Sequence, residues 1–143
     1  MSAVRPLRQF ANVRPLQPIR VLLVGRDTRY LRAVDFLLET QGYTTRRVVW
    51  TGSLVREATR FDADVVVVEA GRGFAEAARQ AAQLAGLTPD IGVVVAVERD
   101  LPAGSERLAF VDKWAPFEGL LASIERVWAE LPAREAQREL QPR

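Results

Sequence analysis

Glu69 is the carboxylate with the most informative position in the sequence, because it directly follows four valines at positions 65–68. Four β-branched residues in a row are too few for a helix and favour a strand that is buried on both faces. In open α/β sheets, ligands bind just beyond the carboxyl ends of the strands, which predicts that Glu69 lies at the mouth of any site. The alternative is that Glu69 merely ends a strand in solvent.

Other charged residues also fall at the ends of predicted strands. Arg26 and Asp27 follow the apolar run at residues 19–25, and Lys113 ends the run at residues 108–113. Lys113 is the only lysine in a chain with 20 basic residues. A single lysine among arginines points to a specific role, the alternative being one residue on a solvated surface.

The composition limits the chemistry that is available to these residues. The chain has no cysteine and no histidine, which excludes disulfides, thiolate and imidazole catalysis, and the usual zinc sites. Of its 143 residues, 48% are hydrophobic and 27% are charged, as in an ordinary soluble domain. Because no apolar run could span a bilayer and no signal-like segment begins the chain, we expect one cytoplasmic domain that does not bind membranes.

Positive charge is concentrated at the start of the chain. Residues 1–20 contain four arginines and no acid, which leaves 16 basic and 18 acidic residues in the remainder. Prolines interrupt residues 1–18 and no helical or strand period runs through them, which predicts a flexible basic arm. The folded part then has no basic face for nucleic acid, and we expect it to bind none.

Predicted strands and helices alternate along the rest of the chain. Apolar runs predict strands at residues 19–25, 45–50, 65–69, 91–97 and 108–113, and helical periods predict helices at residues 28–41, 54–61, 74–87 and 116–131. Proline and glycine at residues 100–105 interrupt the place of one further helix, which is therefore expected to be short or absent. The alternation predicts an α/β fold with a five-stranded parallel sheet between two layers of helices.

Residues 19–131 resemble the receiver domain of bacterial response regulators, a CheY-like, doubly wound fold with strand order 2-1-3-4-5. The most specific matches are residues 20–24 (RVLLV), residues 110–113 (FVDK) and residues 118–124 (EGLLASI). The last two segments look like the end of a NarL/LuxR-type receiver. The remaining residues, 132–143, are expected to form a charged tail.

The resemblance assigns roles to individual positions. Lys113 falls on the active-site lysine of the family and Phe110 on its aromatic switch position. Glu69 falls on the aspartate that accepts the phosphoryl group, and Ala96 on the hydroxyl residue that senses it. The resemblance therefore implies a phosphoacceptor site that is degenerate in this chain.

The acid pair that holds magnesium in the family is also missing. Gly25 and Arg26 fall at its two positions, and Asp27 is the only acid expected nearby. One carboxylate is a poor magnesium site, since this ion needs several oxygen ligands in an octahedral arrangement. We therefore predict no metal, no cofactor and no phosphoryl transfer.

The departures from the family are physically consistent with one another. Arg26 and Lys113 could both pair with Glu69 and hold permanently the state that other receivers reach with a phosphate, because arginine binds carboxylates in a bidentate manner. The alternative is that these positions changed freely once phosphorylation was lost. The sequence does not decide between the two.

These features predict a stand-alone pseudo-receiver, which is a non-enzymatic signal-transduction module that acts by binding a protein partner. One alternative is a conventional receiver of a two-component phosphorelay, with Glu69 or Asp27 as phosphoacceptor. Another is a small-ligand domain on the same fold, although residues 25–28 (GRDT) offer one glycine instead of a phosphate-binding fingerprint. Formation of a homodimer is a further alternative. Trp114 and Trp128 are the predicted interface residues, and the alternative for Trp128 is a position in the core.

Overall fold

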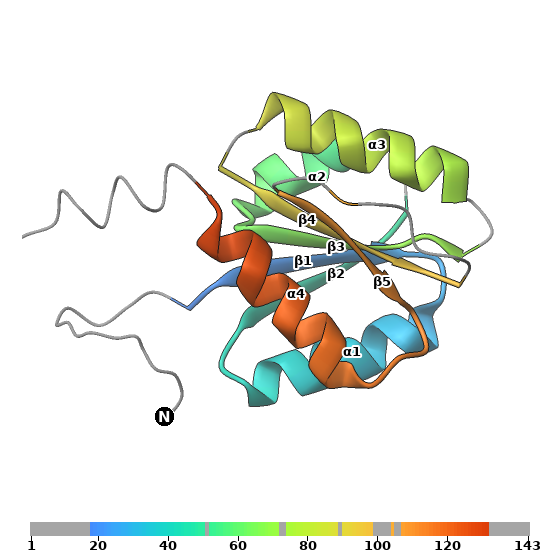
Figure 1. Ribbon diagram of the computed structural model, residues 1–143, viewed down its shortest axis with the longest axis vertical. Helices are drawn as coiled ribbons and strands as arrows, with labels where there is room; N and C mark the ends of the chain where they lie inside the picture. The colour runs from blue at the N-terminus through green and yellow to red at the C-terminus, as the bar shows by residue number, and fades with distance from the viewer. Residues whose placement is uncertain are drawn as a thin grey trace, which may run out of the picture.

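The computed structural model describes residues 18–50, 52–71, 74–88, 90–98, 104 and 107–131. Most of the predicted arm at residues 1–18 and the whole predicted tail at residues 132–143 lie outside these ranges. Within them, the chain forms a sheet with helices on both faces (Figure 1).

The sheet is parallel and has the predicted topology. Its strands are β1 (Arg20–Gly25), β2 (Thr44–Val49), β3 (Val65–Glu69), β4 (Gly92–Val97) and β5 (Leu108–Asp112), in the order β2-β1-β3-β4-β5. Because all pairs are parallel, the carboxyl ends of the strands lie along one edge of the sheet. The predicted strand order is confirmed, and the predicted site residues follow strands that end side by side.

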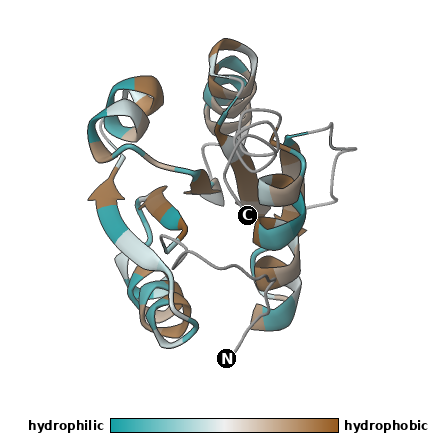
Figure 2. Ribbon diagram, turned by 90° about the vertical axis from the view of Figure 1, so that its left-hand side faces the viewer, coloured by the Kyte–Doolittle hydropathy of each residue, from teal (hydrophilic) through white to brown (hydrophobic). Residues whose placement is uncertain are grey.

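The helices are α1 (Thr28–Thr40), α2 (Leu54–Phe61), α3 (Phe74–Leu87) and α4 (Phe117–Ala129). One face of the sheet is covered by α1 and α4 and the other by α2 and α3, and each helix has both hydrophobic and hydrophilic stretches (Figures 1 and 2). The predicted interruption at residues 100–105 lies outside the described residues except for Gly104, which belongs to no helix. No described helix has the length and apolar character that a bilayer crossing requires.

The valine run of β3 forms the centre of the core. Val66 and Val68 pack in the apolar cluster beneath α2 and α3, whereas Val65 and Val67 pack in the cluster beneath α1 and α4. Alternate side chains of a strand point to opposite faces, so a strand covered on both sides needs apolar residues at every position. This burial fixes where β3 ends and brings Glu69 to the edge of the sheet.

Two helices on this scaffold begin at side chains that cap them. The carboxylate of Asp27 accepts from the backbone N–H of Tyr30 at 3.1 Å at the start of α1, and the hydroxyl of Ser53 accepts from the backbone N–H of Arg56 at 3.3 Å at the start of α2. Such caps satisfy N–H groups that have no partner within the helix. The cap also holds Asp27 at the carboxyl end of β1, beside the end of β3.

Candidate functional site

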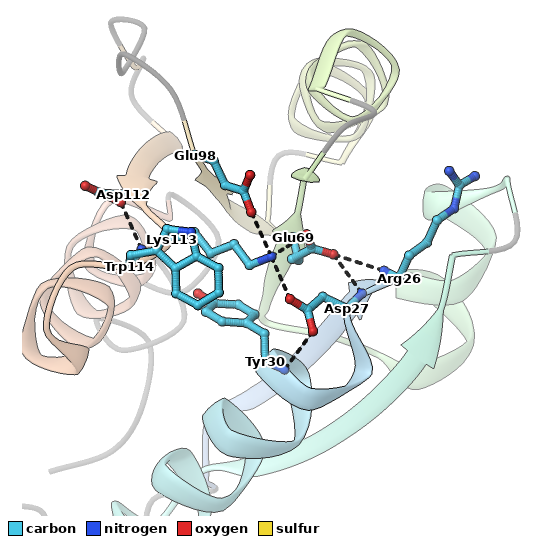
Figure 3. Close-up of polar contacts among 8 residues, drawn as sticks. All are labelled: Arg26, Asp27, Tyr30, Glu69, Glu98, Asp112, Lys113 and Trp114. Atoms are coloured by element: carbon cyan, nitrogen blue, oxygen red, sulfur yellow. Dashed lines mark hydrogen bonds and ion pairs between the residues drawn. The ribbon is translucent and has the colours of Figure 1, made fainter.

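Three carboxylates surround the ammonium group of Lys113 (Figure 3). Its Nζ atom lies 2.8 Å from Asp27 Oδ2, 3.0 Å from Glu69 Oε2 and 3.3 Å from Glu98 Oε2. The side chains of Lys113 and Glu69 are 3% and 4% exposed, whereas those of Asp27 and Glu98 are 32% and 42% exposed. We call these four residues the ion cluster.

The sheet brings the ion cluster together from four segments. Glu69 is the last residue of β3, Asp27 caps the helix that follows β1, and Glu98 and Lys113 directly follow β4 and β5. The backbone N–H of Lys113 donates to the carbonyl of Val97 at 2.7 Å, which continues the β4–β5 pairing by one residue. Parallel pairing therefore fixes the backbone beneath each charged side chain.

The second carboxylate oxygen of Glu69 is held by backbone groups. Oε1 accepts from the N–H of Arg26 at 3.0 Å and from the N–H of Asp27 at 3.1 Å. These amides immediately precede α1, where backbone N–H groups need acceptors from outside the helix. Together with Lys113, they provide donors for both oxygens of the Glu69 carboxylate.

Two glycines leave the space that the Glu69 side chain occupies. A Cβ atom on Gly25 would lie 2.7 Å from both Cβ and Oε1 of Glu69, and one on Gly71 would lie 2.6 Å from Oε2. Gly71 also has a φ of +50°, which side-chain-bearing residues adopt rarely. The longer side chain at position 69 and the missing side chain at position 25 are therefore complementary.

The predicted ion pair between Arg26 and Glu69 is wrong. The side chain of Arg26 is exposed and points away from the ion cluster, and Arg26 contacts Glu69 through its backbone N–H (Figure 3). The backbone amides before α1 already supply the donors that the guanidinium was expected to supply. The prediction that Asp27 is the only nearby acid is also wrong, because Glu98 joins the cluster.

The sequence carries one weak signal for Glu98. It directly follows the apolar run of β4, just as Glu69 ends the valine run of β3, and the two strands are neighbours in the predicted order. Adjacent strand ends place such residues close together. The signal was the position of an acid after a predicted strand, with no motif around it.

The other two positions taken from the receiver pattern lie within strands. Ala96 is a fully buried β4 residue that is paired in register with Glu69, and its methyl side chain offers no hydrogen bond to a ligand. Phe110 is a half-buried β5 residue that packs against the apolar cluster beneath α2 and α3. The structure thus places Ala96 beside the end of β3 and Phe110 on the α2–α3 face.

The ion cluster shifts the pKa values of two of its members. The hydrogen bond from Lys113 holds the pKa of Asp27 below its ordinary value. Burial alone would lower the pKa of Lys113, but the hydrogen bonds to Asp27 and Glu69 outweigh it and raise that pKa. Both shifts favour the charged forms of Asp27 and Lys113. Counted formally, the three carboxylates and one ammonium of the cluster sum to −2.

Two aromatic rings lie beside the ammonium group. Nζ of Lys113 lies 5.2 Å from the ring centroid of Tyr30 and 4.8 Å from that of Trp114. The two rings pack edge to face, with centroids 6.0 Å apart and an angle of 76° between their planes. Burial raises the pKa of Tyr30 to about 12. The rings separate part of the cluster from water, which strengthens its electrostatic interactions.

The two predicted interface tryptophans lie in different environments. Trp114 is 65% exposed, whereas Trp128 is half-buried and packs against the apolar cluster beneath α1 and α4. An interface role for either residue stays a prediction.

The cation at the centre of the ion cluster is the ammonium group of Lys113. In the described part of the chain, no group of three or more metal-ligating side chains is arranged to hold a metal ion. The carboxylate oxygens that face one another are already bonded to Nζ of Lys113. The arrangement can hold charges in fixed positions, and the carboxylate oxygens that face Nζ are already paired with it.

No protein-family model matches the sequence, and no curated protein matches it. Solved structures do match. The chain superposes with a TM-score of 0.61 on a response regulator protein from Burkholderia pseudomallei, which has a phosphorylated aspartic acid and a calcium ion, at 20% identity over 84% of this chain and 74% of that chain.

Two further matches are receiver domains. One is a CheY-like receiver domain protein from Methanospirillum hungatei, with a TM-score of 0.62 and 17% identity over 82% of this chain and 99% of that chain. The other is the signal receiver domain of a NarL response regulator from Mycobacterium tuberculosis, with a TM-score of 0.60 and 15% identity over 77% and 98% of the two chains. These similarities show that the chain has the receiver fold.

Proposed function

We propose that this protein is a pseudo-receiver, which transmits a signal by binding a protein partner and does not undergo phosphoryl transfer. The main support for this proposal is the environment of Glu69. Its side chain is 4% exposed, and its two carboxylate oxygens accept hydrogen bonds from Lys113 and from two backbone N–H groups. Its position at the end of the central strand corresponds to the phosphoacceptor of the receiver pattern.

Phosphoryl transfer to a carboxylate needs a free carboxylate oxygen that can attack the phosphorus atom opposite its leaving group. It also needs a divalent cation that offsets the negative charge of the phosphoryl group. The oxygens of Glu69 are already bonded, and Lys113 occupies the middle of the cluster. A phosphoryl donor would have to break these contacts in a site that is mostly buried. The geometry therefore favours a receiver that stays in one charge state.

Gly25 supports the same proposal. In the receiver pattern its position belongs to an acid of the magnesium pair, but an added Cβ would lie 2.7 Å from Cβ and Oε1 of Glu69. An aspartate at position 25 and a glutamate at position 69 would therefore not fit together without rearrangement. Gly25 and Glu69 are therefore sterically compatible in this structure, which supports a site that holds Glu69 in place.

The proposal is tested by incubating the protein with acetyl phosphate and magnesium and measuring its intact mass. We expect no phosphoryl adduct, while a conventional receiver treated in parallel gains one. A stoichiometric adduct that maps to Glu69 or Asp27 would contradict the proposal and favour a conventional phosphoacceptor. A Gly25→Asp, Arg26→Asp, Glu69→Asp variant, which has the acids of the family pattern, tests whether these positions alone prevent the reaction.

A further inference from the structure

Trp114 presents an apolar surface that is exposed and also held in place. Its residue exposure is 65%, its backbone N–H donates to Asp112 Oδ1 at 2.9 Å, and its ring packs edge to face on Tyr30 (Figure 3). Exposed tryptophans are enriched among the residues that contribute most to binding in protein interfaces. Because this ring is already ordered, binding through it loses little conformational entropy.

Three acidic side chains belong to the same region as this ring. Asp27 and Glu98 are part of the ion cluster, whose formal charge is −2, and the exposed Asp112 adds one further negative charge. The single positive charge of the cluster belongs to Lys113, whose side chain is only 3% exposed. The guanidinium of Arg26 points away from this region (Figure 3). The surface around Trp114 therefore attracts a cation.

We propose that this surface, formed by Trp114, Tyr30, Asp112, Asp27 and Glu98, binds an arginine side chain of a partner protein. The inference rests on the proposed function as an interaction module and specifies the chemistry of its partner. A guanidinium is planar, so it can stack on an indole ring while it donates two parallel hydrogen bonds to a carboxylate. A lysine ammonium is more strongly hydrated and cannot make both contacts in this way.

The probe is a short glycine–serine peptide with two arginines, compared with peptides in which both arginines are replaced by lysine or by uncharged citrulline. Binding is followed by the NMR signals of the indole N–H groups of the three tryptophans, with the Trp114 signal assigned from a Trp114→Phe variant. We expect the arginine peptide to shift the Trp114 signal selectively. The lysine peptide should bind several-fold more weakly and the citrulline peptide about tenfold more weakly, because the latter loses both the charge and the cation–π contact.

Three variants test whether the peptide binds specifically at this site. Trp114→Ala should lower the affinity for the arginine peptide by about tenfold. It should not unfold the protein, since the ring is mostly exposed. Phe36→Ala is the matched control, because Phe36 on α1 is also 65% exposed, and it should leave binding unchanged. Glu98→Gln should weaken binding and reduce its salt dependence.

Several outcomes would overturn the arginine proposal. They are no binding of the arginine peptide, equal binding of the citrulline peptide, or equal losses in the Trp114→Ala and Phe36→Ala variants. Self-association that Trp114→Ala abolishes would assign the surface to a second copy of the chain instead. None of these results involves phosphorylation, whereas a phosphoryl adduct in the acetyl phosphate experiment would contradict the proposed function, so the two failures are distinguishable.

Discussion

The two ends of the central strands β1 and β3 use similar residues in different ways. At the amino end, Arg20 donates from its backbone N–H to Asp64 Oδ2 at 2.9 Å, and its guanidinium donates to the carbonyl of Phe61 at 2.8 and 3.1 Å. The guanidinium also lies 4.3 Å from the ring centroid of Phe61. At the carboxyl end, Lys113 lies beside aromatic rings as well, but it bonds to three carboxylates.

The difference concerns what the charged groups contact. At the amino end, the guanidinium of Arg20 and the carboxylate of Asp64 each bond to a backbone group, which connects β1 to the last residue of α2 and to the residue before β3. At the carboxyl end, carboxylates from three separate segments converge on the ammonium group of a fourth. Fastening two strands would need only one carboxylate. The excess of acids at the carboxyl end, together with its exposed aromatic ring, is the basis on which we propose this end as the interaction site.

Replacing the cation at each end tests the comparison most strongly. Lys113→Met should lower the free energy of unfolding by about 3 kcal/mol or more, because it leaves buried and partly buried carboxylates facing one another without a cation. Arg20→Met should cost about 1–3 kcal/mol, because it removes hydrogen bonds to one carbonyl. Denaturant midpoints and m-values of both variants give the two losses.

A matched double variant shows whether charge causes the larger loss. Glu69→Gln in the Lys113→Met background should recover part of it, since coupled neighbouring charges do not behave additively. Equal losses for Lys113→Met and Arg20→Met would remove the contrast between the two ends.

Gly25→Ala tests how tightly the carboxyl end is packed. The added methyl group would lie 2.7 Å from Glu69, so we expect a loss of about 1–3 kcal/mol from overpacking. Gly86→Ala is the control, since Gly86 lies in α3 with no heavy atom within 4 Å of the added Cβ, and there alanine should stabilise by about 0.5–1 kcal/mol. Thermal or denaturant unfolding measures both changes. Similar effects at the two glycines would show that Glu69 does not need the space at position 25.

The ion cluster should also contribute to the pH dependence of stability. The pKa of Asp27 is lower in the folded protein than its ordinary value of 3.8, so its stabilising contribution is present above that value and is lost as the pH falls through the folded pKa. Urea unfolding between pH 5 and pH 2 should therefore show a smaller acid-side loss in Asp27→Asn than in the unmodified protein. The same loss in both proteins would mean that other carboxylates account for the acid sensitivity.

The smallest effect is expected at Arg26. Its side chain is exposed and its contact with Glu69 comes from the backbone, so Arg26→Met should change the free energy of unfolding by less than about 0.5 kcal/mol. The change should add to that of Glu69→Gln, because the two side chains do not interact. A clear departure from additivity in the double-variant cycle would show that the guanidinium reaches Glu69 in solution.

The fold was accessible from the sequence because its signals are local. The valine run of β3, the alanine-rich segment of α3 and the apolar period of α4 each act within a few positions, and the observed elements lie within one or two residues of the predicted ones. Strand order came from the resemblance to receivers. The prediction of a short or missing helix near residues 100–105 falls almost wholly outside the described residues and stays a prediction.

The site was only partly accessible from the sequence. Strand ends correctly placed Asp27 and Lys113 beside Glu69, since backbone position follows from the parallel sheet. Side-chain direction does not follow from it, and Arg26 was therefore assigned a contact that its backbone N–H makes instead. Glu98 was overlooked because no local pattern distinguishes an acid that joins a cluster from an acid that ends a strand in water.

The sequence by itself determined which charged groups this protein has and at which edge of the sheet they stand, because hydrophobic periodicity places the ends of buried strands. Only the tertiary structure decided that the ammonium of Lys113 would offset part of the negative charge of three carboxylates. It also decided that Gly25 would leave room for Glu69, and that Trp114 would be held in place yet exposed. These outcomes depend on distances of a few ångströms between segments that are far apart in the chain. At that scale, rotamers, excluded volume and access to water determine the energy of a charge.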